Sequence, residues 1–152
     1  MPIGPTFSGD LLQLIFNGVG IANVAMNQSV SPSTLLWFAL HTAAPSSDTQ
    51  STSEAAYTSY TRVSVARSTA SPAFSYTAAS SAGAGAKINP NATISFPAAT
   101  SGTVAETETY ISAGLSSAGA GKILWTAALS PTIAVSNGVT PRLTTASTIT
   151  LA

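Results

Sequence analysis

The sequence predicts an all-β fold, an antiparallel and jelly-roll-like β-sandwich with a short N-terminal helix or arm. Beyond residue 32, short segments alternate apolar and polar residues with the two-residue period of strands. Gly, Pro and Asn separate these segments at short intervals, as in antiparallel sandwiches and jelly rolls. With 152 residues the chain is long enough for one domain with a core. We therefore expect a single β-sandwich domain over residues 33–152, with residues 1–32 docking on its core or on a neighbour.

The N-terminal element is expected to be a short helix. Ser8 supplies an N-cap, Asp10 lies in the first turn, and Asn17-Gly18 ends the helix. So short a helix is not stable alone, so its apolar side chains must pack either on the chain's own core or on a neighbouring subunit. The candidate inter-subunit contacts are Leu11, Leu12, Ile15 and Phe16.

The first half of the predicted sandwich contains two clear strands. Ser33–Thr42 is apolar on both faces, which predicts a strand inside two layers. Tyr57–Arg67 alternates more cleanly, which predicts a strand whose Tyr60, Arg62 and Ser64 face water. Weaker strands are expected at Phe74–Thr77 and at Ala92–Phe96, the latter opened by Asn89-Pro90-Asn91 and closed by Pro97.

The second half repeats this pattern. Strands are expected within Thr103–Leu115, over Lys122–Leu129 after a turn at Gly119–Gly121, over Thr132–Val135 after a break at Ser130-Pro131, and over Thr144–Leu151 after the hairpin signal Asn137-Gly138. Ala43–Ala56 and Ala78–Ala86 are predicted to be loops, either solvated or ordered against neighbours. The predicted core residues are Leu36, Phe38, Leu40, Val63, Val65, Ile94, Phe96, Ile123, Trp125 and Leu129.

The chain has few charges: five Lys or Arg and five Asp or Glu, while Ala, Ser, Thr and Gly supply 82 residues. An ordinary domain is about a quarter charged, so this surface suits permanent contact with other proteins. Scattered Lys and Arg with zero net charge predict no nucleic-acid partner. The absence of Cys excludes disulfides and Cys-ligated zinc. The apolar stretch over residues 11–26 is interrupted by polar residues, so no membrane partner is expected.

The sequence offers little chemistry. The only histidine, His41, lies within an apolar strand, so we expect it to be structural. Glu106 and Glu108 point to one face of a strand, as paired carboxylates or metal ligands do, but a solvated pair explains them better. No nucleophile, phosphate-binding or metal motif is present. We therefore expect a protein that is not an enzyme, with no catalytic residue, no metal ligand and no cofactor.

The order of several segments resembles a family of small tailed-bacteriophage virion proteins, described as tail-fibre-like or as capsid decoration (cement) proteins. The resemblance covers residue 33 to the end and departs from the family pattern at Glu106-Thr107-Glu108. It implies a jelly-roll-like β domain in the virion with no catalytic residue. The matching segments are Leu40-His41-Thr42, Tyr60-Thr61-Arg62, Phe96–Thr100, Gly119–Gly121 with Ile123-Leu124-Trp125, and Thr148–Leu151.

The low charge favours the cement function, because large permanent contacts then bury few unpaired ions. We expect a structural protein on the capsid exterior that stabilises the head by bridging subunits of the major capsid protein. It would self-associate, most simply as a two-fold dimer. The alternative is a tail-fibre-like or receptor-binding tail protein. A third possibility, a carbohydrate-binding module, requires exposed aromatic residues, whereas alternation places both Trp in the core.

Overall fold

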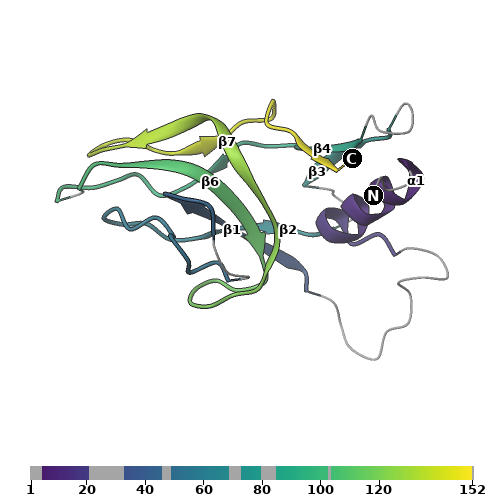
Figure 1. The fold of residues 1–152 in the computed structure, drawn as a ribbon, viewed down its shortest axis with the longest axis horizontal. Helices are drawn as coiled ribbons and strands as arrows, with labels where there is room; N and C mark the ends of the chain where they lie inside the picture. Colours follow the sequence, from purple (N-terminus) through teal and green to yellow (C-terminus); the bar gives the residue numbers. More distant parts are fainter. Residues whose placement is uncertain are drawn as a thin grey trace. The chain divides into compact units, whose positions relative to one another are not determined.

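The structure, a computed structural model, describes residues 5–20, 33–45, 49–68, 73–79, 85–102 and 104–151. It confirms the all-β fold class, with antiparallel sheets and a short helical segment at the N-terminus (Figure 1). The elements are α1 (Pro5–Leu12), η1 (Gln13–Asn17), β1 (Leu35–His41), β2 (Val63–Ala66), β3 (Phe74–Thr77), β4 (Ala86–Pro90), β5 (Ile94–Ser95), β6 (Glu106–Gly114), β7 (Ile123–Val135), β8 (Arg142–Leu143) and β9 (Ile149–Leu151).

The chain divides into two compact units. Unit 1 contains Met1–Thr34, Ala66–Thr93 and Leu143–Ala152, and unit 2 contains Leu35–Val65 and Ile94–Arg142. This division differs from the predicted boundary between residues 32 and 33. The N-terminal helix shares its unit with strands from the middle and the end of the chain, because it packs against β3, β4 and β9.

Unit 2 is built around a four-stranded sheet with the order β2-β1-β6-β7. β1 and β6 are antiparallel, with Phe38 opposite Ala113 and Leu40 opposite Ile111. These four side chains and Leu36 are buried on one face of the sheet, as the alternation of β1 predicts. A two-stranded sheet of β5 and β8 accompanies it, and the buried Ile94 and Phe96 come from this part of the chain.

The predicted core residues fall into two groups. Leu36, Phe38, Leu40, Ile94 and Phe96 are buried. The others are only half-buried, and all of them lie on β2 or β7, the edge strands of the four-stranded sheet. A residue on an edge strand has a neighbouring strand on one side only, so it is not fully covered. Ile123 also lies opposite Gly114, on the other face of the sheet from Trp125, because the register against β6 shifts between these two residues. The half-buried residues are Val63, Val65, Ile123, Trp125 and Leu129.

The predicted break at Ser130-Pro131 appears as an irregularity inside one long strand. β7 runs without interruption through thirteen residues. Its register against β6 shifts between Glu108 and Tyr110, which pair with Ile133 and Ala128. Leu129–Thr132 therefore lie opposite the single residue Thr109, so the extra residues form a bulge. Proline is tolerated there because an edge strand or a bulge does not need its missing N–H.

The strand predicted over Tyr57–Arg67 is much shorter in the structure. Only Val63–Ala66 form β2. Before it, Ser59 has a left-handed φ of 78°, and the N–H of Tyr60 donates to the carbonyl of Tyr57 over 3.0 Å, which closes a turn. The aromatic rings drive this turn inward, because Tyr57 packs edge-to-face on Tyr60 with centroids 5.2 Å apart. The prediction that Tyr60 and Arg62 face water was therefore wrong, since Arg62 is only 5% exposed.

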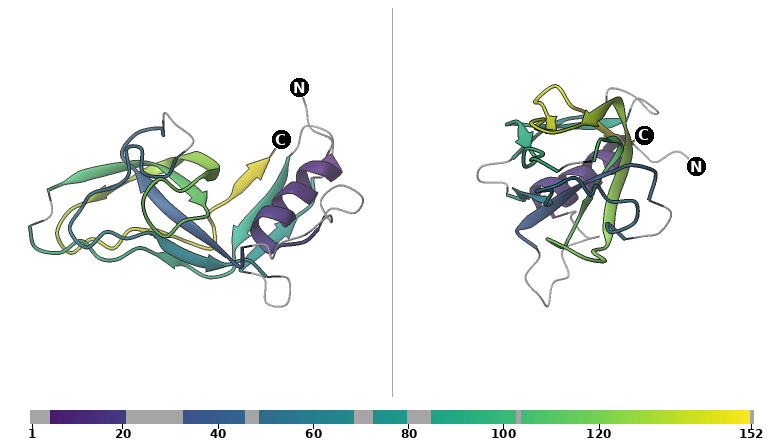
Figure 2. Two further views of the ribbon diagram at one scale, coloured as in Figure 1. Left: turned by 90° about the horizontal axis from the view of Figure 1, so that it is seen from below. Right: turned by 90° about the vertical axis from the view of Figure 1, so that its left-hand side faces the viewer.

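The N-terminal helix of unit 1 begins earlier than predicted. It starts at Pro5, a residue favoured in the first turn, so Ser8 lies buried inside α1 and does not cap it. The helix continues as one π-helical segment, η1, and ends where predicted, because Gly18 takes a left-handed φ of 72°. Figure 2 shows α1 lying against the teal strands of the same unit.

A three-stranded sheet with the order β3-β4-β9 lies under this helix. β3 coincides with the predicted strand, and Phe74 on it packs edge-to-face on Phe16 with ring centroids 5.1 Å apart. β4 was not predicted as a strand, although its Ala86, Ile88 and Pro90 alternate as buried residues. The alternation of buried and exposed residues covers only five positions there. The Asn89-Pro90 pair at its end is found where a strand ends as well as in turns.

Parts of several predictions lie outside the described residues: positions 21–26 of the N-terminal apolar stretch, 46–48 of the first predicted loop and 80–84 of the second. Within the described residues, no helix is long and apolar enough to cross a membrane.

Candidate functional site

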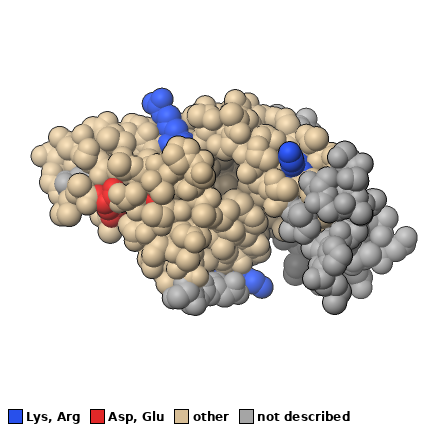
Figure 3. All heavy atoms as spheres, turned by 45° about the horizontal axis from the view of Figure 1, so that its top comes forward, with Lys and Arg blue, Asp and Glu red and all other residues tan. Residues whose placement is uncertain are grey.

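Most charged side chains in the described residues are drawn into the fold. Of the ten in the sequence, only Lys87, Lys122 and Arg142 are exposed in the part of the chain that the structure describes. Most of the described surface visible in Figure 3 carries neither basic nor acidic atoms. Four of the charges that remain inside, Glu54, Arg62, Glu106 and Glu108, lie in unit 2.

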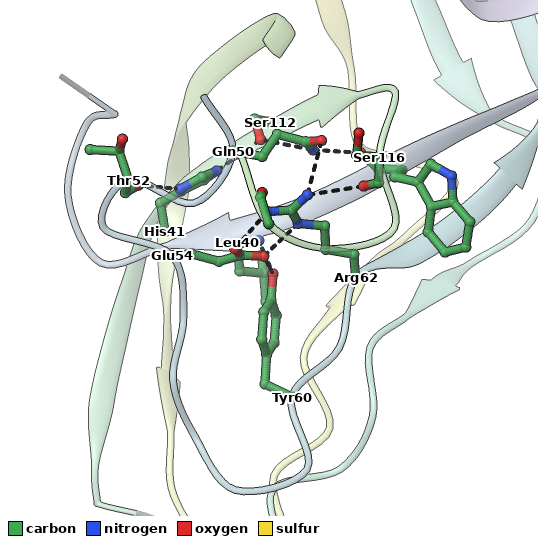
Figure 4. A network of polar contacts seen from close by, with 11 residues as sticks. Leu40, His41, Gln50, Thr52, Glu54, Tyr60, Arg62, Ser112 and Ser116 are labelled. Carbon is green, nitrogen blue, oxygen red and sulfur yellow. Dashed lines mark hydrogen bonds and ion pairs between the residues drawn. The ribbon is translucent and has the colours of Figure 1, made fainter. Parts of the chain in front are cut away.

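The centre of unit 2 holds a polar group of side chains that we call the Arg62 cluster: Arg62, Glu54, Gln50, Tyr60, His41 and Ser112 (Figure 4). The guanidinium of Arg62 forms a bidentate ion pair with Glu54, with Nε to Oε1 and Nη2 to Oε2 both at 2.7 Å. Its other N–H groups donate to the carbonyls of Ser116 (3.0 Å) and Gly119 (2.6 Å) and to Gln50 Oε1 (3.4 Å). All five donors of Arg62 are therefore used within the chain.

Glu54 receives a third hydrogen bond, because the Tyr60 hydroxyl donates to its Oε1 over 3.0 Å. The same hydroxyl accepts the backbone N–H of Leu40 at 3.1 Å, which links the cluster to β1. Burial, followed by the charge of Glu54, raises the pKa of Tyr60 well above its ordinary value. Tyr60 is consequently a neutral donor at any physiological pH.

Gln50 and His41 extend the cluster beneath the sheet. The amide of Gln50 donates to the carbonyl of Trp37 (2.8 Å) and to Ser112 Oγ (3.4 Å). His41 Nδ1 lies 2.9 Å from the carbonyl of Thr52, which only accepts, so Nδ1 holds the proton. Nε2 then accepts from Ser112 Oγ at 2.8 Å. Burial lowers the pKa of His41, which keeps this arrangement neutral.

A serine hydroxyl hydrogen-bonded to a histidine is also the geometry of an activated nucleophile. Here both residues are 0% exposed, and the second histidine nitrogen is bonded to a carbonyl. The pair instead tethers the loop that contains Thr52 to β1 and β6, which agrees with the structural role expected for His41.

Gly114 makes room for the Gln50 side chain. A Cβ at this position would overlap the carboxamide of Gln50 and lie 2.6 Å from the backbone oxygen of Lys122. Gln50 is fully buried, and backbone cannot move aside as a flexible side chain can. Glycine is thus required at the end of β6 because the Gln50 side chain and the Lys122 backbone approach it closely, and not because of turn geometry.

Replacing Gly114 with Ala is expected to lower the free energy of unfolding by about 1–3 kcal/mol, because the methyl group overpacks a buried site. Thermal unfolding followed by circular dichroism would measure the loss. Adding Gln50→Ala relieves only the side-chain overlap, so the double variant should stay below the wild type. Full recovery in the double variant would contradict a backbone clash with Lys122.

A pocket of about 240 Å³ opens beside the Arg62 cluster. Its polar groups are largely occupied, because Arg62 donates both to the Glu54 carboxylate and to carbonyls of the loop after β6. The pocket therefore offers hydroxyl and backbone groups more than charge. Its lining residues are Glu54, Ala55, Tyr60, Thr61, Arg62, Ser117, Ala118 and Gly119.

Glu106 and Glu108 share one face of β6, as predicted, but they are not a solvated pair. Glu106 accepts the backbone N–H groups of Ala56 (3.1 Å) and Tyr57 (2.8 Å) through Oε1. Glu108 is 0% exposed, and neither of its carboxyl oxygens has a hydrogen-bond partner among the described residues. Burial first, and the charge of Glu106 second, raise the pKa of Glu108 to about 8. Glu108 is therefore mainly protonated at neutral pH.

Glu106 and Glu108 also affect the pKa of Tyr57. Burial, then the charges of Glu108 and Glu106, raise its pKa to about 12. Its hydroxyl donates to the carbonyl of Pro97 over 3.0 Å. Among the described residues, no group of three or more His, Cys, Asp or Glu is placed to hold a metal ion.

In unit 1, Arg67 holds the end of the N-terminal helix. Its Nε donates to the carbonyls of Leu14 (3.0 Å) and Ile15 (2.7 Å), Nη2 donates to Leu14, and Nη1 donates to Ser33 over 3.1 Å. A cation at the last carbonyls of a helix is favourable, and burial lowers the pKa of Arg67. No sequence pattern indicated this role for Arg67.

The candidate contact residues of the helix are divided by burial. Leu12 and Phe16 are buried inside unit 1, at 2% and 0% exposure. Leu11 and Ile15 are half-buried. Only the latter two retain appreciable surface for contact with another molecule.

The Arg62 cluster was missed because its members are spread over residues 41–112 and lack a motif. One signal was available, since Tyr60-Thr61-Arg62 is a segment that carries the resemblance described above. The fold and the cluster together define an all-β protein whose buried polar groups hold its own loops in place.

The family model described as podophage GP4 fiber I protein gp80 matches residues 17–151. The chain belongs to this family, and it is therefore a structural protein of the bacteriophage virion. A search of curated proteins found no match.

Proposed function

We propose that this protein is a fibre subunit of the phage virion, the tail-fibre-like alternative considered for the sequence. The observation that supports it is the family match, because its description is of a fiber protein and its extent, residues 17–151, includes every strand. The main prediction, a cement protein that bridges major capsid subunits on the capsid exterior, was favoured over this alternative mainly by the low charge. Permanent contacts between fibre subunits would favour a surface of low charge just as the contacts of a cement protein would. The low charge therefore does not distinguish a fibre subunit from a cement protein.

A carbohydrate-binding module is less well supported. Its six candidate aromatic residues are all buried or half-buried, so they offer no open platform for a sugar ring. These residues are Trp37, Trp125, Tyr57, Tyr60, Tyr76 and Tyr110.

Deleting the gene from the phage should yield particles with normal, DNA-filled heads that fail to adsorb to the host. Adsorption counts, electron microscopy of the heads and complementation by the wild-type gene would measure this. The copy number should be far below that of the major capsid protein, and an antibody label should lie on a fibre. Fragile heads, or a copy number close to that of the major capsid protein, would instead establish the cement function.

A further inference from the structure

Glu108 is a buried acid without a partner for a negative charge. Its side chain is 0% exposed, and neither carboxyl oxygen has a hydrogen-bond partner among the described residues. An ionised carboxylate that lacks water, donors and a counter-ion is very costly in a protein interior. The structure therefore holds Glu108 as the neutral acid, and its ionisation requires that water reach it.

The strands beside Glu108 supply no compensating charge. β6 and β7 contain no Lys, Arg or His. Glu106 and Tyr110 share the face of β6 that carries Glu108, and Ile133 lies opposite Glu108 on β7. The charge on this part of the sheet is thus the negative charge of Glu106, which opposes a second one.

The other titratable groups on this side of unit 2 cannot serve as counter-ions either. His41, at the end of β1, is kept neutral by burial, which lowers its pKa. Glu54 and Arg62 form an ion pair with each other. Tyr57 is a neutral phenol, because its pKa is raised to about 12. Only contact with solvent can stabilise an ionised Glu108.

The element that covers the two acids is the loop of residues 56–59, which we call the 56–59 strap. The backbone N–H groups of Ala56 and Tyr57 donate to Glu106 Oε1 over 3.1 and 2.8 Å. Tyr57 is only 3% exposed, and the charge of Glu108 contributes to the shift of its pKa. The strap therefore lies over the face of β6 that carries both acids.

The strap is held less firmly than the segments at its two ends. The N–H of Ala55 donates to the carbonyl of Leu40 over 2.9 Å, and the Tyr60 hydroxyl accepts the N–H of Leu40 at 3.1 Å. Between these fixed points the chain leaves the Arg62 cluster as a loop without strand pairing (Figure 4), and Ser59 has a left-handed φ of 78°. A segment held by a few hydrogen bonds opens at a lower cost than a strand within a sheet.

We propose that the 56–59 strap is a proton-controlled device, which stays closed while Glu108 is protonated and lifts from β6 when this acid releases its proton to solvent. Ionisation places two carboxylates on one face of β6, and the two N–H groups of the strap cannot satisfy both. Lifting admits water to both acids, brings Tyr57 to the surface and leaves the four-stranded sheet intact. The inference does not depend on the fibre assignment, and failure of either one leaves the other standing.

Hydrogen exchange of the Ala56 and Tyr57 amides, measured by NMR, tests the strap. With the strap open, Glu108 ionises near its ordinary pKa of 4.5, whereas the closed strap holds the proton until about pH 8. Opening therefore releases one proton in this range. The protection of both amides, corrected for the intrinsic exchange rate, should fall about tenfold per pH unit between pH 5 and 8.

Glu108→Gln keeps the shape of the side chain but has no proton to release, so its protection at Ala56 and Tyr57 should not depend on pH. Thr107→Gln, at an exposed position of the same strand, is the matched control and should behave like the wild type. Protection that is independent of pH in the wild type, or that falls equally in Glu108→Gln, would overturn the proposal.

The amides of the ladder between β1 and β6 separate local opening from global unfolding. They should remain at least about tenfold more protected than the amides of Ala56 and Tyr57 at every pH, because the sheet stays closed when the strap lifts. Equal protection of the ladder and the strap would show that Glu108 ionises only when the whole fold opens, and it would refute the strap.

Discussion

Replacing Arg62 with Leu is expected to lower the free energy of unfolding by about 3–5 kcal/mol, the usual cost of removing one partner of a buried ion pair. Glu54 would keep only the Tyr60 hydroxyl, and the carbonyl of Ser116 would lose the Arg62 donor, whereas that of Gly119 would keep the N–H of Gly121. For a chain of this size the loss corresponds to a fall of roughly 10 °C in the midpoint of thermal unfolding. It is also a large fraction of a total stability of about 5–15 kcal/mol.

The Arg62→Lys variant separates charge from geometry. Lysine keeps the positive charge but lacks the planar fork that holds both Glu54 oxygens and the loop carbonyls together, so it should recover only part of the loss. Arg142→Leu removes an exposed arginine and should change the free energy of unfolding by no more than about 0.5 kcal/mol. A lysine variant as stable as the wild type would show that the hydrogen-bond geometry contributes little.

Raising the pH from 5 to 9 is expected to destabilise the wild-type protein through Glu108. The unfolded chain releases this proton near the ordinary pKa of 4.5, whereas the folded chain holds it until about pH 8. Between these values the folded state binds more protons, so the free energy of unfolding falls as the pH rises. This loss develops between about pH 4.5 and pH 8 and does not grow further above that range. Thermal unfolding at a series of pH values would measure it.

The Glu108→Gln variant cannot ionise at this position. It should unfold at a higher temperature than the wild type at pH 9, and its stability should change much less between pH 5 and 9. Thr107→Gln, an exposed residue on the opposite face of the same strand, should retain the wild-type pH dependence. A wild-type midpoint that is flat across this range would contradict the buried proton.

The fold class was predictable because it depends on local signals. The alternation in β1 and β3 and the glycine that ends the helix are each decided within a few residues. Edge position is decided instead by which strands pair across the sequence. Trp125 therefore lies beside Ala113 on the apolar face yet remains half-buried, because its strand has one neighbour. The loop before β2 also depends on a distant partner, since Tyr60 stacks on Phe96 with centroids 6.4 Å apart.

The candidate site could not be assembled from the sequence for the same reason. The four polar side chains of Glu54, Arg62, Gln50 and Ser112 belong to three separate stretches of chain that meet only in the folded sheet. The alternation of apolar and polar residues predicted that Arg62 faces water, because such a pattern carries no information about an ion-pair partner elsewhere in the chain. Glu106 and Glu108 were placed on one face correctly, but their burial follows from the loop at Ala56 and Tyr57, which bonds to Glu106.

The inward placement of charge affects how fast this protein assembles. Long-range attraction accelerates association only when unpaired charges lie at the surface, and here Arg62, Arg67 and Glu106 are already committed to partners within the chain. Encounters with neighbouring subunits should therefore proceed at the unsteered rate, about 10⁵–10⁶ M⁻¹ s⁻¹. They should also depend little on ionic strength, because Lys87, Lys122 and Arg142 are the only exposed charges among the described residues and leave a weak field for salt to screen. Contacts of this kind form slowly and persist when the salt concentration around the virion changes.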